Sequence, residues 1–310
     1  RLDYSTGSEA FLLEPQSTNL VTYSEDFSQW TISGAIAITS NYGISPDGTN
    51  NSTRIVFSGG SQNIYKNFTS SSAVNGSIYV KGNSGDEIKI GVTGGEQVVT
   101  LNGNWQRVTT YSASSTIFTV NTYGVNGRDV QIWGAQVEAQ SFATSYIPTS
   151  GASATRNQEL CNNATPVINS EEGTLYAEIS ALANDNTSRV ICLSNGTNSN
   201  RALVSYSASL NKILAFHNNG TDQVLLDFIV SDITNFHKVA FKFAENDYAL
   251  WINGVEVATS LVGGVNIANT LDRLDFRNAS GSSSFNGNTK GLKVYPKALA
   301  DVQLQDLTTI

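Results

Sequence analysis

The sequence has little positive charge and no long apolar run. Its 18 Lys and Arg residues stand against 26 Asp and Glu residues, which gives a net charge of −8 at pH 7. Affinity for nucleic acid depends on a basic surface that neutralises phosphates, so nucleic acid is excluded as a predicted partner. A membrane-spanning helix needs about 20 consecutive apolar residues, and no run in the chain approaches that length. We therefore expect no insertion into a membrane.

Residue types that carry catalysis are also scarce. The chain has two histidines: His217 in the turn-like segment HNNGT, and His237 at the start of a strand pattern. We interpret both as structural. The sequence contains no GxSxG elbow, no zinc-type spacing of Cys and His, and no glycine-rich phosphate loop after a strand. These absences argue against nucleophilic, metal-dependent and phosphoryl-transfer chemistry.

Two cysteines leave the thiol state open. Cys161 and Cys192 could pair across a loop of about 30 residues, whereas the apolar run VICL around Cys192 favours a buried thiol. Asp185, in the Asx-rich segment NDNTS, offers a hard oxygen ligand for a structural calcium ion, but such segments are also common exposed turns. We therefore predict no cofactor and no metal site.

What the chain does contain is the composition of a turn-rich all-β protein. Hydrophobic residues make up 40% and charged residues 14%, Gly, Ser, Thr and Asn are abundant, and Met is absent. This composition favours strands and turns over helices. A length of 310 residues suits two domains of about 150 residues each.

Alternating apolar residues predict strands in both halves. In EIKIGV, for example, Ile88, Ile90 and Val92 share one face, and in YALWINGVEVA the pair Asn253-Gly254 fits a type I′ hairpin turn. In VQIWGAQVE the alternation of inward and outward residues is interrupted at Gly134, which predicts a bulge there. Further strand patterns occupy residues 77–82, 105–111, 117–123, 174–180 and 238–243. Only residues 298–307 have a helical pattern.

The two predicted domains meet at a segment that has no regularly spaced apolar residues. Residues 149–155 contain only Thr, Ser, Gly and Ala, so we place one domain at residues 1–155 and the other at residues 156–310. We expect two tandem antiparallel β-sandwiches with one short C-terminal helix.

Two stretches of the first half resemble a known group of proteins. The segments LLEPQSTNLVTYSEDFSQW (12–30) and IWGAQVEAQSFATSYIPTSGASATR (132–156) are similar to jelly-roll modules of phage and prophage tail-fibre or other virion surface proteins. Those modules have the architecture of carbohydrate-binding modules. The resemblance implies a jelly roll over residues 1–155, a virion-surface or extracellular location and sugar binding.

The second half resembles laminin-G-like, concanavalin-type domains. The resemblance is carried by FHKVAFKFAENDYALWINGVEV (236–257) and FNGNTKGLKVYPKALADVQLQDL (285–307). The helix start departs from the family pattern, because Ala300 stands where Ser or Thr is usual. Concanavalin-like glucan hydrolases use a Glu-x-Asp-x-x-Glu pattern, but here Glu245-Asn246-Asp247 is followed by Leu250 at the third acidic position. We therefore expect a binding protein and predict no enzymatic activity.

Sugar ligands stack on aromatic rings and exchange hydrogen bonds with amides, so exposed Trp, Tyr and Asn are the candidates. Polar neighbours select three aromatic residues of the first half: Trp30, Tyr42 and Tyr65. In the second half, polar loops expected at the sandwich ends add four further candidates: Asn198, Arg201, Asn218 and Arg277. No catalytic residue is predicted.

We hypothesise a non-enzymatic phage tail- or head-fibre protein that recognises a host surface polysaccharide or other glycan. Other virion proteins are expected partners, and the resembled fibres imply a homo-oligomer, expected to be a trimer. Linked weak sites would then bind with raised apparent affinity. Two alternatives stay open: accessory carbohydrate-binding modules of a secreted polysaccharide-degrading enzyme, and a structural capsid or tail decoration that binds no sugar.

Overall fold

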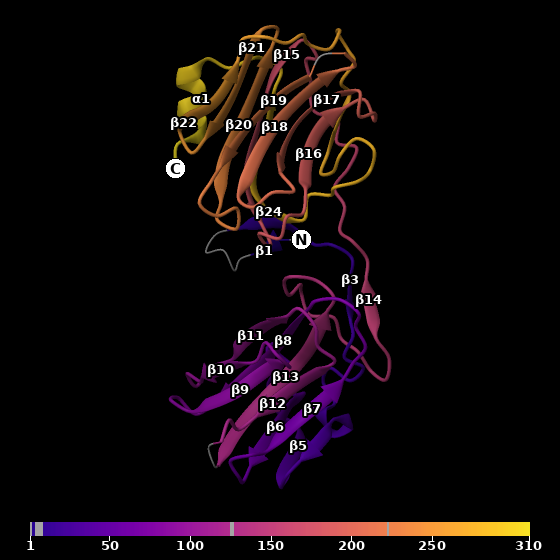
Figure 1. Cartoon of the computed structure of the whole chain (residues 1–310), viewed down its shortest axis with the longest axis vertical. Coiled ribbons are helices and arrows are strands. Elements are labelled where there is room, and N and C mark those ends of the chain that lie inside the picture. Colours follow the sequence, from indigo (N-terminus) through magenta and orange to yellow (C-terminus); the bar gives the residue numbers. More distant parts are fainter. Residues whose placement is uncertain (1, 4–8, 125–126, 222) are drawn as a thin grey trace. The chain divides into compact units, whose positions relative to one another are not determined.

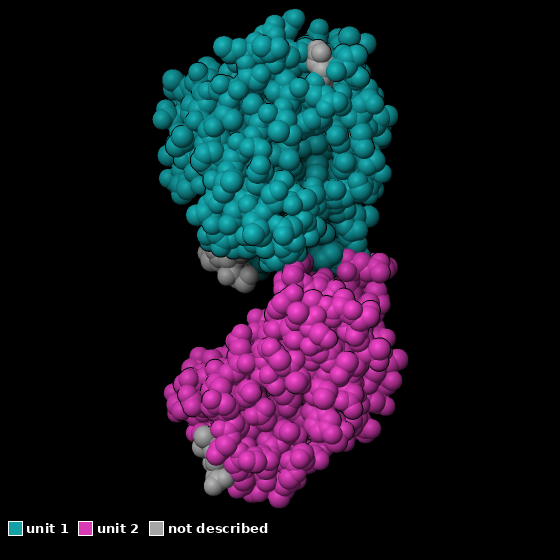
Figure 2. All heavy atoms as spheres, in the orientation of Figure 1, with its two compact units in different colours: residues 1–15, 158–310 teal, residues 16–157 magenta. Residues whose placement is uncertain are grey.

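The protein is built almost entirely from antiparallel strands, as predicted (Figure 1). A computed structural model describes residues 2–3, 9–124, 127–221 and 223–310. The chain divides into two compact units, unit 1 (residues 1–15 and 158–310) and unit 2 (residues 16–157), coloured separately in Figure 2. Among the described residues, no helix has the length and apolar character needed to cross a membrane.

Unit 2 is a sandwich of two five-stranded sheets. One sheet has the order β10 (Gln97–Thr100), β9 (Glu87–Val92), β12 (Ile117–Asn121), β7 (Asn63–Asn67) and β4 (Thr31–Ser33). The other has the order β11 (Gln106–Ser112), β8 (Val74–Gly82), β13 (Arg128–Glu138), β6 (Ser52–Phe57) and β5 (Ile36–Gly43). A two-stranded ribbon pairs β3 (Ser17–Asn19) with β14 (Ala154–Arg156), and a short 3-10 helix, η1, covers Phe27–Gln29.

The alternating sequence pattern fills the space between these two sheets. Apolar side chains that face inward from both sheets are fully buried, among them Ile55, Ile78, Ile90, Phe118 and Val120. Because strand side chains alternate, the intervening residues of each strand lie on the outer faces. The predicted bulge is confirmed: Gly134 has a φ of 67°, and the register between β13 and β8 shifts between Trp133 and Gln136.

Unit 1 is a second sandwich. Its larger sheet has the order β1 (Leu2–Asp3), β2 (Ala10–Leu13), β24 (Gly287–Tyr295), β15 (Glu172–Ala181), β20 (His237–Ala244), β21 (Asp247–Ile252) and β22 (Val255–Ser260). Its smaller sheet has the order β19 (Gln223–Ile229), β18 (Lys212–Asn219), β17 (Asn200–Tyr206), β16 (Arg189–Ser194) and β23 (Arg273–Asp275). The core between them includes Leu175, Val204, Ile213, Phe241 and Phe285.

The hairpin and the helix of unit 1 follow their local sequence. Asn253 and Gly254 have φ values of 51° and 82°, as the predicted type I′ turn between β21 and β22 requires. The helix α1 (Asp301–Thr308) packs on the outer face of the larger sheet and covers Trp251. Ala300 has no side-chain oxygen to accept from the first N–H groups of the helix, and its own N–H donates to Oε1 of Gln303 at 3.1 Å.

The domain limits differ from the prediction at the N-terminus. Residues 1–15 were expected in the first domain, but β2 pairs with β24 and therefore belongs to unit 1. Unit 2 is thus an insertion in the sequence of unit 1. The second limit, predicted after residue 155, lies after residue 157.

Candidate functional site

Two neighbouring strands of unit 2 carry a matched set of polar side chains on their outer face. In β7 the core residue Ile64 separates Asn63 from Tyr65, and in β12 the core residue Val120 separates Thr119 from Asn121. The register places the outward residues of the two strands opposite one another, with the pairs Asn63–Asn121, Tyr65–Thr119 and Asn67–Ile117. An aromatic ring with amides on either side therefore lies in the middle of this face.

These residues line a groove with a volume of about 350 Å³, which we name the Tyr65 groove. Its walls also include the turn after β9, where the Gly94 N–H donates to Oε2 of Glu96 at 3.0 Å. The full lining set is Asn63, Tyr65, Asn67, Thr93, Glu96, Ile117, Thr119 and Asn121. The groove thus combines one ring, three amides and one carboxylate.

Two polar atoms of the groove side chains have no hydrogen-bond partner among the residues that the structure describes. They are Oγ1 of Thr119, whose residue is only 7% exposed, and Oδ1 of Asn63. Buried polar atoms are almost always hydrogen-bonded, and leaving one unpaired costs roughly 1–3 kcal/mol. Each of these two atoms has less than 1 Å² of accessible surface, so they belong to the wall of the groove and are not contact points for a ligand.

The Tyr65 groove continues into a second hollow of about 220 Å³, which shares Asn63 and Asn121 with it. Tyr123 lies in this second hollow and is 56% exposed. Its N–H donates to Oδ1 of Asn121 at 3.1 Å, and Nζ of Lys89 lies 5.8 Å from its ring centre. Two tyrosines therefore stand along one polar surface, which suits an elongated ligand.

Of the predicted aromatic residues, Tyr65 lies in this groove, whereas Trp30 does not. Trp30 is a core residue that is 4% exposed, and its Nε1 donates to the carbonyl oxygen of Tyr23 at 2.8 Å. Its ring packs against those of Phe27 and Phe118. The structure therefore removes Trp30 from the ligand-binding candidates, because its ring faces are covered by protein.

Tyr42 lies on the other sheet of unit 2, at the end of β5, and is 46% exposed. The guanidinium of Arg54 lies 5.0 Å from the centre of its ring. Tyr42 therefore belongs to a different pocket from Tyr65, so the two predicted tyrosines do not form one site.

Three of the four candidates in unit 1 lie close together. Nη1 of Arg201 donates to Oδ1 of Asn198 at 3.1 Å and to Oδ1 of Asn278 at 2.5 Å, and Arg201 pairs in register with Asn218. Arg277 precedes Asn278 in the same loop, but among the described contacts no hydrogen bond joins it to the other candidates. The Arg201 guanidinium also lies over the ring of Phe216, at 4.9 Å. These contacts join Arg201 of β17 to the loop that contains Asn278.

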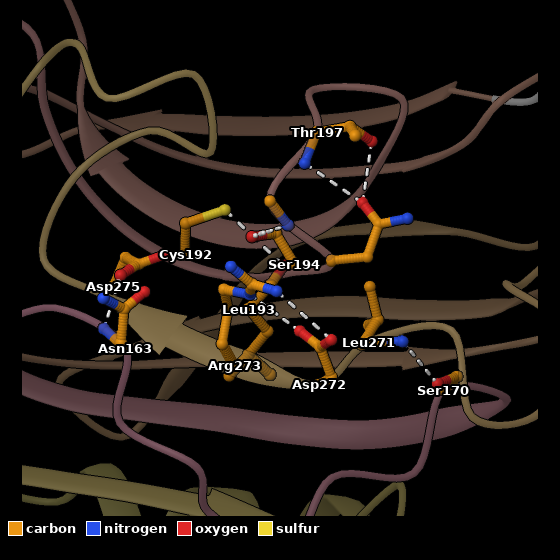
Figure 3. Close-up of polar contacts among 12 residues, drawn as sticks. Asn163, Ser170, Cys192, Leu193, Ser194, Thr197, Leu271, Asp272, Arg273 and Asp275 are labelled. Carbon is orange, nitrogen blue, oxygen red and sulfur yellow. Dashed lines mark hydrogen bonds and ion pairs between the residues drawn. The ribbon is translucent and has the colours of Figure 1, made fainter.

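Figure 3 shows the polar contacts around the end of β23 in unit 1. Oδ1 of Asp275 accepts from the N–H of Asn163 at 2.7 Å, and Arg273 pairs with the adjacent Asp272 at 2.8 Å.

Both cysteines are free thiols, and burial raises the pKa of Cys192 to about 12. This raised pKa keeps the thiol protonated and unreactive.

The predicted structural roles of Asp185 and the histidines can be placed in the fold. Asp185 accepts a hydrogen bond from Nη2 of Arg189 at 2.9 Å, an ion pair that competes with a cation for the same oxygen. His217 was expected in a turn but is fully buried in β18, where its Nε2 accepts from Nδ2 of Asn266 at 3.1 Å. His237 begins β20. Among the described residues, no group of three or more His, Cys, Asp or Glu side chains could hold a metal ion.

A known family matches the C-terminal half of the chain. Residues 152–305 match the concanavalin A-like lectin/glucanases superfamily, as represented by its laminin-G profile. The predicted concanavalin-type assignment of the C-terminal half is therefore confirmed. No match was found among curated protein sequences.

Solved structures to which this chain is similar include one bacterial and one mouse domain structure. The CBM40 of a Ruminococcus gnavus IT-sialidase, bound to alpha2,6 sialyllactose, aligns with 48% of this chain and 98% of its own at 16% identity and a TM-score of 0.38. Domains LG4-5 of the mouse laminin alpha1 chain align with 78% of this chain and 90% of their own at 9% identity and a TM-score of 0.33.

Most residues of the Tyr65 groove were missed by the sequence analysis. The missed residues include Asn63, Asn67, Thr119 and Asn121, in the segments NIYKN and IFTVN. In each segment polar or aromatic residues flank a buried apolar residue, Ile64 or Val120, which is the signal that could have identified one outer face. What the sequence could not supply is the pairing of these two strands, which lie about 50 residues apart.

Proposed function

We propose that this protein is a non-enzymatic glycan-binding protein that holds its ligand in the Tyr65 groove of unit 2. The observation that carries the proposal is the ring of Tyr65 set among three asparagine amides in an open groove. Aromatic faces stack on the apolar C–H faces of sugars, and amides both donate to and accept from sugar hydroxyls. An open groove with these groups suits a polysaccharide chain.

A binding role is favoured over hydrolysis by the acidic residues of the groove. Glycosidases usually use two carboxyl groups on either side of the scissile bond, whereas Glu96 is the one carboxylate in the groove lining. One of its oxygens already accepts from the Gly94 N–H. We therefore assign Glu96 to the turn and to ligand contact rather than to acid-base catalysis.

The biological setting that we propose is the surface of a phage virion, where the protein contacts a host polysaccharide. Support comes from the segments EPQSTNL and SYIPT, which resemble phage and prophage tail-fibre modules. In such a fibre, several copies of one weak groove bind together with raised apparent affinity. A homo-oligomer, expected to be a trimer, and contacts with other virion proteins form part of the same proposal.

The proposal predicts that removal of the Tyr65 ring abolishes most glycan binding. A multimerised full chain is applied to an array of bacterial polysaccharides, and the affinity for any retained glycan is then measured by calorimetry. We expect Tyr65→Ala to weaken binding at least about tenfold, the equivalent of about 1.4 kcal/mol of stacking. Tyr111→Ala is the matched control, since Tyr111 is 49% exposed on β11 in the opposite sheet.

Three outcomes would contradict the proposal. If no glycan is retained by the multimerised chain at millimolar concentration, the chain is better explained as a structural decoration. If Tyr65→Ala and Tyr111→Ala weaken binding equally, the ligand does not occupy the Tyr65 groove. Release of shortened saccharides from any bound polymer would contradict the absence of enzymatic activity.

A further inference from the structure

A second polar pocket lies on the other sheet of unit 2, on its outer face and thus on the far side of the sandwich from the Tyr65 groove. Its volume is about 370 Å³. We name it the Arg54 pocket; the lining residues used below are Tyr42, Arg54, Lys81, Asp129 and Gln131. No part of the glycan groove contributes to this lining.

Three side chains form a row across three adjacent strands at this pocket. In the register of the sheet, Gln131 of β13 pairs with Arg54 of β6 on one side and with Lys81 of β8 on the other. All three point outward, because their chain neighbours Ile55 and Val80 are fully buried core residues. Side chains directly opposite in an antiparallel sheet lie about 4.5–5.5 Å apart at Cβ. The row therefore places one cation, Arg54 or Lys81, on each side of the Gln131 amide.

Existing contacts hold part of this row and leave hydrogen-bond donors for a ligand. Nε and Nη2 of Arg54 donate to the two carboxylate oxygens of Asp129 at 2.9 and 2.6 Å, which leaves Nη1 outside the pair. Oε1 of Gln131 accepts from the hydroxyl of Ser52 at 3.0 Å, so its free amide edge is the donor Nε2. The ring of Tyr42 supports the guanidinium from one face, at 5.0 Å.

The charge of the pocket is positive, in contrast to that of the chain. Lys81 has no ion-pair or hydrogen-bond partner among the described residues. Its charge is therefore not cancelled, whereas Arg54 is neutralised by Asp129. The hydrogen bonds from Arg54 hold the pKa of Asp129 below its ordinary value, which keeps this pair ionised at neutral pH. One uncompensated cation stays on a protein whose net charge is −8.

We infer that the Arg54 pocket binds a carboxylate-bearing sugar. A carboxylate placed over Gln131 can accept from Nζ of Lys81 and Nη1 of Arg54, and charge-assisted hydrogen bonds of this kind are the strong ones. The hydroxyl groups of the same sugar can donate to the outer lone pairs of Asp129. The ligand class is thus an acidic saccharide, and the site is independent of the neutral stacking surface around Tyr65.

The test uses the full chain and three probes: tetragalacturonate, its methyl ester, and a sulfated tetrasaccharide. The ester keeps the sugar ring but removes the charge, so it isolates the carboxylate. We expect calorimetry to show binding of tetragalacturonate, with the methyl ester and the sulfated probe each at least about tenfold weaker. The affinity should fall as the NaCl concentration rises from 20 to 200 mM, because salt screens the charge of Lys81.

Substitutions locate the site. Lys81→Gln removes the uncompensated charge and should weaken tetragalacturonate about tenfold. Lys297→Gln is the matched control, since it removes one exposed positive charge from unit 1 and should change the affinity less than about twofold. Lys81→Gln should leave the affinity for a neutral glycan held in the Tyr65 groove unchanged, because Lys81 is not part of that groove's lining, and this separates the inference from the proposed glycan groove. Equal melting temperatures of the variants confirm that each is folded.

Three results would overturn the inference. The first is no binding of tetragalacturonate to the unmodified chain at millimolar concentration. The second is equal weakening by Lys81→Gln and Lys297→Gln, which would indicate attraction to overall charge. The third is tighter binding of the sulfated probe than of tetragalacturonate, since a pocket built for a planar carboxylate should prefer it.

Discussion

At the scale of single residues, His237 is an example of a buried titratable group with one hydrogen bond. It is 5% exposed, and its Nδ1 donates to the carbonyl oxygen of Asn235 at 2.9 Å. Burial lowers its pKa below the ordinary 6.5, although the Asn235 carbonyl and Asp232 oppose the shift. The unfolded chain therefore binds this proton more tightly than the folded chain does. The stability from neutral His237 is present above about pH 6.5 and is lost as the pH falls through the lower folded pKa.

Because the pKa of His237 is lower in the folded chain than in the unfolded chain, we predict that unit 1 becomes less stable in mild acid. We expect the melting temperature of unit 1, measured by calorimetry, to fall between pH 7.5 and pH 5. His237→Asn keeps a donor for the Asn235 carbonyl but does not titrate in this range, so its decline should be shallower. Identical pH slopes for the two proteins would show that His237 does not contribute to the effect.

Tyr65 and Trp30 show how far single residues can be assigned from sequence. Both have polar neighbours along the chain, and both were predicted to face a ligand. Only Tyr65 lies in a groove, because the Trp30 ring packs against Phe118, which lies 6.0 Å away on a distant strand. Exposure depends on which strands meet, and the local sequence around Trp30 carries no information about β12.

At the scale of elements, β2 is a strand of unit 1 that precedes unit 2 in the sequence. It pairs with β24 through Phe11, Leu12 and Leu13. Leu13 is 3% exposed and belongs to the core of unit 1, whereas Phe11 is 36% exposed. Unit 1 should therefore depend on this strand for part of its stability.

We predict that Leu13→Ala lowers the free energy of unfolding of unit 1 by about 2–4 kcal/mol through loss of buried contacts. Phe11→Ala is the control in the same strand and should have a smaller effect, because Phe11 is 36% exposed. Urea unfolding followed by ¹⁹F NMR of fluorotryptophan separates the units, because Trp251 lies in unit 1 and the other three Trp residues lie in unit 2. A shift of the Trp30, Trp105 and Trp133 signals instead would contradict the assignment of β2 to unit 1.

The elements also differ in how well the sequence predicts them. The hairpin at Asn253-Gly254 and the bulge at Gly134 depend on backbone angles that those residues themselves favour, and both were predicted. The pairing of β2 with β24 joins segments at opposite ends of the chain. No local pattern encodes such a pairing, so residues 1–15 were assigned to the wrong sandwich.

At the scale of the whole molecule, the chain leaves unit 1 and returns to it at neighbouring points. The N–H of Glu159 donates to the carbonyl oxygen of Glu14 at 3.0 Å, and the N–H of Glu14 donates to Oε2 of Glu159 at 2.9 Å. On the other side of the crossing, β3 pairs with β14 through three residues of each strand. The ends of the inserted segment are thus held together within each unit separately.

We predict that both units fold when separated at these crossings. Residues 16–157 alone should unfold cooperatively, within about 5 °C of their transition in the full chain. Residues 1–15 joined by a short Gly-Ser linker to residues 158–310 should also fold, whereas residues 158–310 alone should be less stable, because they lack β2. Calorimetry of the three proteins checks this, and equal stability with and without residues 1–15 would contradict it.

The same arrangement determines where mechanical tension would pass. The first described strand, β1, and the last helix, α1, both belong to unit 1. A pull applied at Leu2 and Thr308 is therefore carried by the hydrogen bonds of β2 and β24, and unit 2 stays unloaded until β2 is peeled from its sheet. A ligand held in the Tyr65 groove would then be shielded from strain along the backbone of the chain.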